Sequence, residues 1–116
     1  MLLGVGAPVS GSWATPENCR EIAVLAEELG YHSLWTFQRL LSPVDSDDRA
    51  VLDPQYRSVL DPIATLGFLA AVTRRVRLGV AVLNLPFVSP ITAAKQLATI
   101  DVLSGGRLDC GFGTGW

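Results

Sequence analysis

Two adjacent polar residues, Gln38 and Arg39, directly follow an apolar segment and are the first candidates for a chemical role. Neither is a good proton donor near neutral pH, because an amide does not titrate and a guanidinium keeps its proton. Arg39 could instead stabilise negative charge that develops on a bound group. A salt bridge to an aspartate of the following loop explains Arg39 equally well. Both residues are therefore candidate catalytic residues without an assigned proton-transfer role.

The other chemically active side chains are isolated from suitable partners. His32 is the single histidine, and nothing beside it forms a catalytic dyad. Cys19 and Cys110 belong to no C-x-x-C pair and have no clustered histidine. We therefore expect two buried structural thiols in a reducing compartment and no metal site.

Three glycines alternate near the end of the chain, at positions 111, 113 and 115. A strand face without side chains leaves room for a flat group to lie against it. Close packing, or a loop that needs positive φ, explains the same glycines and is the interpretation favoured on fold grounds. The G-x-G pairs are not dinucleotide fingerprints, because Val9 and Trp116 stand where the third glycine would be.

Strands and helices alternate along the sequence. Short apolar or β-branched segments predict strands at 2–8, 34–37, 77–83 and 108–113. Thr15-Pro16, Asp61-Pro62 and Ser89-Pro90 each combine a capping residue with a proline suited to the first helical position. The pattern predicts an α/β fold with a parallel sheet, in which the carboxyl ends of the strands meet at one edge.

Apolar spacing predicts which face each helix buries. The expected inward residues are, in chain order, Ile22, Leu25, Ala26 and Leu29; Ile63, Leu66, Leu69 and Ala70; and Ile91, Ala94, Leu97, Ala98 and Leu103. Residues 38–58 form a polar connection longer than usual, and such loops are commonly functional or mobile. Its Asp45, Asp47, Asp48 and Arg49 are interpreted as a solvated charge run.

The last third of the chain, RVRLGVAVLNLPFVSPITAAKQLATIDVLSGGRLDCGFGTGW, resembles the luciferase-like flavin and deazaflavin oxidoreductases, which include the coenzyme F420-dependent enzymes. The resemblance extends upstream through EELGYHSLW and LDPIATLGFLAAVT. It implies the N-terminal half of a (β/α)₈ TIM barrel, with four strands alternating with three helices. A complete barrel takes roughly 250 residues, so residues 1–116 are expected to be a partial luciferase-like domain truncated after the fourth strand.

The resemblance also implies a coenzyme site at the strand ends, with a bulge that often includes a non-prolyl cis peptide bond. Ala81-Val82 is therefore expected to be cis or strongly bulged. Many deazaflavin-dependent members carry Asp-His or Glu-His where this chain has Gln38 and Arg39, so the location is carried over and the role is not. Trp116 is expected to stack on substrate or coenzyme, or to fray at the end of the chain. The implied coenzyme-binding residues are Ala81, Val82, Leu83, Asn84, Thr114 and Gly115.

The implied activity is hydride transfer with coenzyme F420 and a small-molecule substrate. The alternatives are an FMN-dependent monooxygenase and a non-enzymatic half-barrel that binds partners, including a second copy, through exposed strand edges. The isolated 116-residue chain is expected to be inactive.

A net charge of −2 and a pI near 5.2 argue against binding to nucleic acid or anionic lipid. The chain has no secretory signal and no apolar segment long enough for a membrane span, so a cytoplasmic location is expected.

Overall fold

The computed structural model describes residues 1–42 and 54–115. Loop residues 45–49 and Trp116, to which the sequence assigned a charge run and a stacking role, lie outside the described residues. The strands are β1 (Gly4–Gly6), β2 (Ser33–Thr36), β3 (Arg77–Asn84) and β4 (Leu108–Gly113), and the helices are α1 (Pro16–Glu28), α2 (Pro62–Val72) and α3 (Pro90–Ser104). Short 3₁₀ turns occupy η1 (Gly11–Trp13), η3 (Pro54–Arg57) and η4 (Leu85–Phe87).

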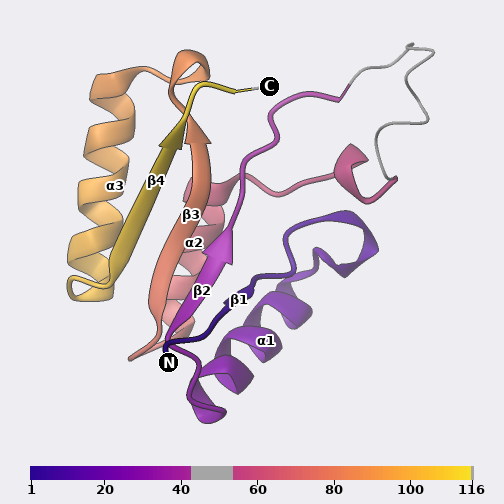
Figure 1. Ribbon diagram of the computed structural model, residues 1–116, viewed down its shortest axis with the longest axis vertical. Helices are drawn as coiled ribbons and strands as arrows, with labels where there is room; N and C mark the ends of the chain where they lie inside the picture. Colours follow the sequence, from indigo (N-terminus) through magenta and orange to yellow (C-terminus); the bar gives the residue numbers. More distant parts are fainter. Residues whose placement is uncertain (43–53, 116) are drawn as a thin grey trace.

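The four strands form one parallel sheet in the order β1-β2-β3-β4, as predicted. Their carboxyl ends all point the same way, towards the upper edge in Figure 1. A single apolar core joins the sheet to all three helices, with Leu34 and Leu78 from the strands meeting Ala23, Leu66 and Leu97 from the helices. The helices therefore cover one face, and the chain has the α/β architecture of a half-barrel. The first strand is shorter than predicted, at three residues.

Each helix begins where the sequence predicted. Thr15 Oγ1 accepts a hydrogen bond from Asn18 N at 3.1 Å, and Asp61 Oδ1 accepts one from Ala64 N at 2.9 Å. Ser89 Oγ accepts from Thr92 N at 3.5 Å, and a proline occupies the first helical position in all three cases. Each cap satisfies a backbone donor that has no partner within its helix.

The predicted inward face is correct for α2 and wrong for much of α1 and α3. In α1, Leu25 and Leu29 are exposed and the buried residues are Cys19, Ala23 and Ala26. Small residues on this face let the helix backbone approach the sheet closely. In α2, Leu66, Leu69 and Ala70 are buried as predicted, and Ile63 packs against the core.

In α3 only Leu97 of the predicted face is buried, and it is joined by Ala93, Ile100 and Ser104. Ile91 is 84% exposed and Leu103 is 69% exposed. Apolar residues at helical spacing occur on both sides of this helix, so periodicity alone did not identify the buried side. The Ser104 hydroxyl is accommodated because it accepts a hydrogen bond from Arg107 N at 3.2 Å.

The amino ends of the strands are held by a dense polar network. The Arg107 guanidinium donates to the carbonyl oxygens of Ser104 at 2.6 Å and Val76 at 2.8 Å, and to Thr73 Oγ1 at 2.9 Å. Further bonds reach the carbonyls of Ala70 and Thr73, both at 3.3 Å. One side chain thus joins the ends of α2 and α3 to the start of β3.

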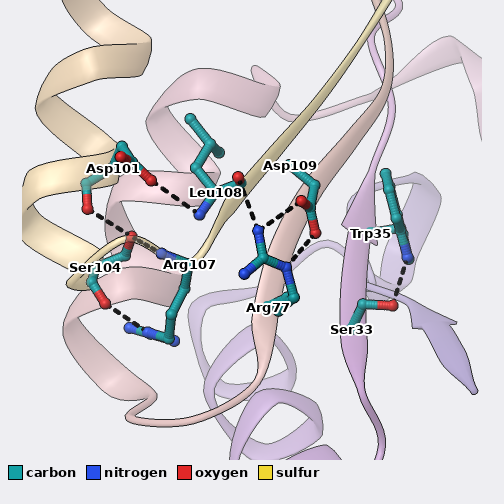
Figure 2. A network of polar contacts seen from close by, with 8 residues as sticks. All are labelled: Ser33, Trp35, Arg77, Asp101, Ser104, Arg107, Leu108 and Asp109. Carbon is teal, nitrogen blue, oxygen red and sulfur yellow. Dashed lines mark hydrogen bonds and ion pairs between the residues drawn. The ribbon is translucent and has the colours of Figure 1, made fainter. Parts of the chain in front are cut away.

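Two carboxylates, Asp109 (Figure 2) and Glu27, complete this end of the sheet. Asp109 forms a bidentate ion pair with Arg77, with both N···O distances 2.6 Å, and this hydrogen bonding lowers the pKa of Asp109. Glu27 accepts hydrogen bonds from the backbone N–H groups of Arg74, Arg75 and Val76. Burial raises the pKa of Glu27, but these three donors outweigh it and the pKa is lowered.

The face of the sheet opposite the helices carries Trp35, whose indole N–H donates to Ser33 Oγ at 2.8 Å (Figure 2). A Cβ at Gly79 would lie 2.4 Å from the Trp35 ring, and one at Gly4 would lie 2.8 Å from Trp35 Nε1. These two glycines therefore let the indole lie across three strands.

Candidate functional site

A cavity of about 350 Å³ lies at the carboxyl edge of the sheet. Its walls come from the segment after β2, from the far end of β3 and from η3. The lining residues are Phe37, Gln38, Arg39, Tyr56, Ala81, Val82 and Asn84. Five of these seven are residues that the sequence had singled out, and they converge because parallel strands end at a shared edge. A second cavity of about 110 Å³, lined in part by Gln38, Arg39 and Asn84, adjoins this position.

Gln38 connects the two strands that form the cavity wall. The residue is 8% exposed, and its Oε1 accepts a hydrogen bond from the backbone N–H of Asn84 at 2.8 Å. The contact holds the end of β3 beside the end of β2. Gln38, predicted only as a catalytic candidate, therefore has a positioning contact that the sequence did not reveal.

The strand β3 bends at Ala81 and Val82. The peptide bond between them is cis and the pairing with β4 shifts register between Val80 and Leu83, in agreement with the cis or bulged geometry that the family resemblance implied. Both Ala81 and Val82 are exposed and line the cavity. The bulge thus presents two small apolar side chains to the rim.

The alternating glycines of β4 accommodate this bulge. A Cβ at Gly113 would lie 2.6 Å from Val82 Cγ2, and one at Gly111 would lie 3.3 Å from Val82 Cγ1. Gly115 has a φ of +86°, which L side chains rarely adopt. Close packing and positive φ, the interpretation favoured from the sequence, therefore account for the three glycines.

The remaining predicted residues lie away from the larger cavity. Leu83 is fully buried and its side chain belongs to the apolar core, because the bulge shifts the register of β3 after Val80 and places Leu83 on the core side. Thr114 is exposed and Gly115 lies beside Phe87, which lines the smaller cavity. Neither of these two lines the larger cavity.

Two aromatic residues of the cavity were missed from the sequence. The Phe37 and Tyr56 rings meet edge to face, with centroids 5.9 Å apart and an interplanar angle of 71°. Tyr56 comes from η3, within the long polar connection, and an aromatic residue in such a loop was the available signal. The pair fixes η3 against the rim.

The charge of the larger cavity comes from Arg39. Of the seven residues that line it in the described structure, Arg39 alone carries a formal charge at neutral pH. Gln38, Tyr56 and Asn84 add hydrogen-bonding groups, while Ala81 and Val82 add apolar surface. This mixture suits a flat, partly apolar group with oxygen atoms that accept hydrogen bonds or carry negative charge.

The two cysteines are separate from this site. Cys19 is a buried residue of α1, and its thiol donates to the Pro8 carbonyl at 3.5 Å. Cys110 is only partly buried, so the prediction of two buried thiols is correct for Cys19 and wrong for Cys110. Burial raises the pKa of both Cys19 and Cys110, so the reactive thiolate is disfavoured. Over residues 1–42 and 54–115, the side chains form no group of three or more His, Cys, Asp or Glu able to hold a metal ion. Over the same ranges, no helix is both long and apolar enough to cross a membrane.

Comparison with known proteins places these features in a family. A family model described as luciferase-like monooxygenase matches residues 2–116. An uncharacterized protein of Mycobacterium tuberculosis is 39% identical over 101 residues, which are 81% of this chain and 36% of the relative. The oxygenase component of the flavin-dependent trigonelline monooxygenase of Acinetobacter baylyi is 30% identical over 95 residues, covering 82% of this chain and 23% of that protein.

Solved structures show the same fold. The coenzyme F420-dependent tetrahydromethanopterin reductase of Methanopyrus kandleri superposes with a TM-score of 0.73 at 22% identity, over 99% of this chain and 27% of the reductase chain. The described sheet and helices therefore match part of a (β/α)₈ barrel. The chain spans about a third or less of the length of these relatives.

Proposed function

The chain belongs to the luciferase-like monooxygenase family, and we propose that the protein is an oxidoreductase that binds a flavin or deazaflavin ring at the carboxyl edge of its sheet. The cavity formed by the ends of β2 and β3 carries this proposal, because it joins apolar wall, hydrogen-bonding groups and one cation in one place. Bound there, such a ring would supply hydride transfer to or from a substrate, and a flavin would also supply oxygen activation.

The cavity fits the ring portion of such a coenzyme. Its volume of about 350 Å³ is near the lower end of the roughly 300–1,000 Å³ range of ligand pockets. Ala81 and Val82 offer an apolar surface for a flat ring, and Gln38 and Arg39 stand beside them with N–H donors. The chain's own contribution is to orient the ring, exclude water from one side of it and place positive charge near its oxygen atoms.

Coenzyme F420 is the first candidate, as the sequence resemblance implies, with hydride transfer to or from a small-molecule substrate. FMN with oxygen is the second. Two observations support this second candidate. The trigonelline monooxygenase relative is flavin-dependent, and Gln38 and Arg39 stand where many deazaflavin-dependent members have an acidic residue followed by histidine.

This function is tested by titrating the whole natural protein with each coenzyme. We expect saturable changes in coenzyme fluorescence with one of the two, and loss of binding in Ala81→Phe, whose ring would fill the cavity. Ala98→Phe, at an exposed alanine of α3, is the matched control and should bind normally. If the unaltered protein binds neither coenzyme, the proposed function is wrong. Normal binding by Ala81→Phe would move the site elsewhere.

We also propose that the 116-residue chain, studied alone, associates through its strand edges and binds coenzyme weakly or not at all. β1 and β4 each have one neighbour in the sheet, and Leu2 and Phe112, at or beside these strands, are 74% and 53% exposed. Unpaired backbone beside exposed apolar residues favours association. Sedimentation velocity should show a dimer or larger species, and a clean monomer would contradict this. Tight coenzyme binding by the 116-residue chain would contradict the expected weakness.

A further inference from the structure

Gln38 combines burial with a position in the cavity wall. The residue is 8% exposed, yet it lines both cavities at the carboxyl edge. A buried amide has one acceptor oxygen and one donor nitrogen, and each needs a partner when it is removed from water. The two ends of this amide therefore have to be considered separately.

The hydrogen bond to Asn84 determines which end is which. A backbone N–H can only donate, so the atom facing Asn84 N at 2.8 Å must be the amide oxygen. The amide nitrogen is thereby directed away from Asn84 N. Among the described residues, the amide oxygen of Gln38 accepts the bond from Asn84 N. The amide nitrogen is the donor that Gln38 can offer to the cavities that it lines.

We propose that the amide nitrogen of Gln38 donates a hydrogen bond to a carbonyl or anionic oxygen of the bound coenzyme ring. This bond orients the ring and favours its reduced, more electron-rich form. The proposal rests on the proposed function, because it requires a ring in this cavity. Gln38 then has two roles at once: its oxygen positions the end of β3, and its nitrogen contacts the ring. Arg39, next in sequence and in the same wall, supplies charge to the same side.

The variant Gln38→Glu separates the two roles. A glutamate has nearly the same shape and keeps an oxygen for Asn84 N, but at neutral pH it has an acceptor in place of the nitrogen donor. A carboxylate facing a ring oxygen removes a hydrogen bond and adds repulsion, so we expect coenzyme affinity to fall about tenfold or more, with the larger loss for the reduced ring. Thermal unfolding should change little, because the bond to Asn84 is retained.

The pH dependence identifies contact with the ring. When the introduced carboxyl is protonated it becomes a donor, so the affinity of Gln38→Glu should return towards that of the unaltered protein as the pH falls. The measurement is coenzyme dissociation constants by fluorescence at pH 8 and pH 5, each divided by the value for the unaltered protein. Gln96→Glu, the same change at an exposed position of α3, is the control and should give a ratio near one at both pH values.

The outcomes are distinguishable from failure of the proposed function. If the unaltered protein binds neither coenzyme, the proposed function fails and takes this inference with it. If the unaltered protein binds a coenzyme and Gln38→Glu binds it equally well, only the inference is overturned. A loss of affinity that is the same at both pH values also overturns it, because a purely structural role would not respond to protonation in this way.

A second variant covers the case in which Gln38→Glu does not fold. Gln38→Met has a similar shape with neither donor nor acceptor, so it should unfold at a lower temperature and also bind the ring about tenfold or more weakly. Circular dichroism confirms the fold before each titration. Coenzyme binding by folded Gln38→Met at the strength of the unaltered protein would overturn the proposal.

Discussion

The two ends of the sheet are built differently. At the amino end, Arg107 makes five hydrogen bonds and Glu27 receives three backbone N–H groups, which leaves the chain ends of α2 and β3 tightly bonded. At the carboxyl end, the Gln38 side chain accepts a hydrogen bond from Asn84 N beyond the last paired residues of β2, and a cavity of about 350 Å³ lies beside it.

This difference separates stability from chemistry. Barrel enzymes of the (β/α)₈ type place their active sites at the carboxyl end and use the opposite end for stability. In this chain the separation is visible within four strands, since polar groups at the amino end bond to one another while those at the carboxyl end face a cavity. Substitutions at the amino end should therefore change the free energy of unfolding, and substitutions at the carboxyl end should change coenzyme affinity.

Arg107→Met should have the largest effect on stability. It removes five hydrogen bonds and leaves the carbonyls of Val76 and Ala70 without this donor, and each buried group left unsatisfied costs about 1–3 kcal/mol. Chemical denaturation of the whole natural protein should show a lower free energy of unfolding for the variant than for the unaltered protein. Coenzyme affinity of the folded variant should stay within about twofold of that of the unaltered protein, because the substitution lies at the opposite end of the sheet.

The matched control for that prediction is Arg20→Met, at an exposed arginine of α1. It should change the free energy of unfolding by no more than about 0.5 kcal/mol. Equal destabilisation by the two variants would mean that the network at the amino end adds nothing to stability. A selective loss of coenzyme affinity in Arg107→Met would remove the proposed division between the two ends.

Gly113→Ala should have a smaller effect on stability and a larger one on the cavity. The added Cβ would lie 2.6 Å from Val82 Cγ2, so the Val82 side chain has to move within the cavity wall. Overpacking of this kind costs about 1–3 kcal/mol, and the exposure of Val82 should keep the cost near the lower limit. Coenzyme titration should show altered affinity, in contrast to Arg107→Met.

The double variant Gly113→Ala with Val82→Ala tests the cause. Removing the valine methyl groups relieves the contact, so the two changes should be less destabilising together than the sum of each alone. Additive effects would show that Gly113 is required for another reason, such as its backbone conformation.

The sheet could be predicted from local signals in the sequence, whereas the positions of the candidate site residues were implied by the family resemblance. Cap-proline pairs define the helix starts, apolar segments define the strands, and parallel strands bring their carboxyl ends together. Gln38, Arg39 and the bulge at Ala81 and Val82 therefore lie in one cavity wall as a consequence of topology.

What could not be predicted depends on tertiary contacts. The face that α3 buries was misassigned because both sides carry apolar residues, and packing of Ala93 and Ile100 against the core determines the outcome. The bond from Asn84 to Gln38 joins residues 46 positions apart, and the approach of Tyr56 to Phe37 likewise has no local signal. Leu83 was included with its neighbours, but regular alternation after Val80 would place Val82 in the core, and the bulge places Leu83 there instead.

Asp109→Asn should have the smallest effect and should appear only over a defined pH range. Arg77 holds the pKa of Asp109 below its usual value by hydrogen bonding, so in the unfolded chain this carboxyl binds a proton more readily than in the folded one. The ion pair therefore stabilises the fold above about pH 4, and this stabilisation disappears as the pH falls through the lowered pKa. The difference in unfolding free energy between the unaltered protein and Asp109→Asn should be positive at pH 7 and vanish in acid.

The control is Glu21→Gln, at an exposed position of α1, which should show no such difference. A difference that persists at low pH would mean that the contribution of Asp109 does not depend on its charge, and a change in coenzyme affinity would show that the amino end of the sheet influences the site at the other.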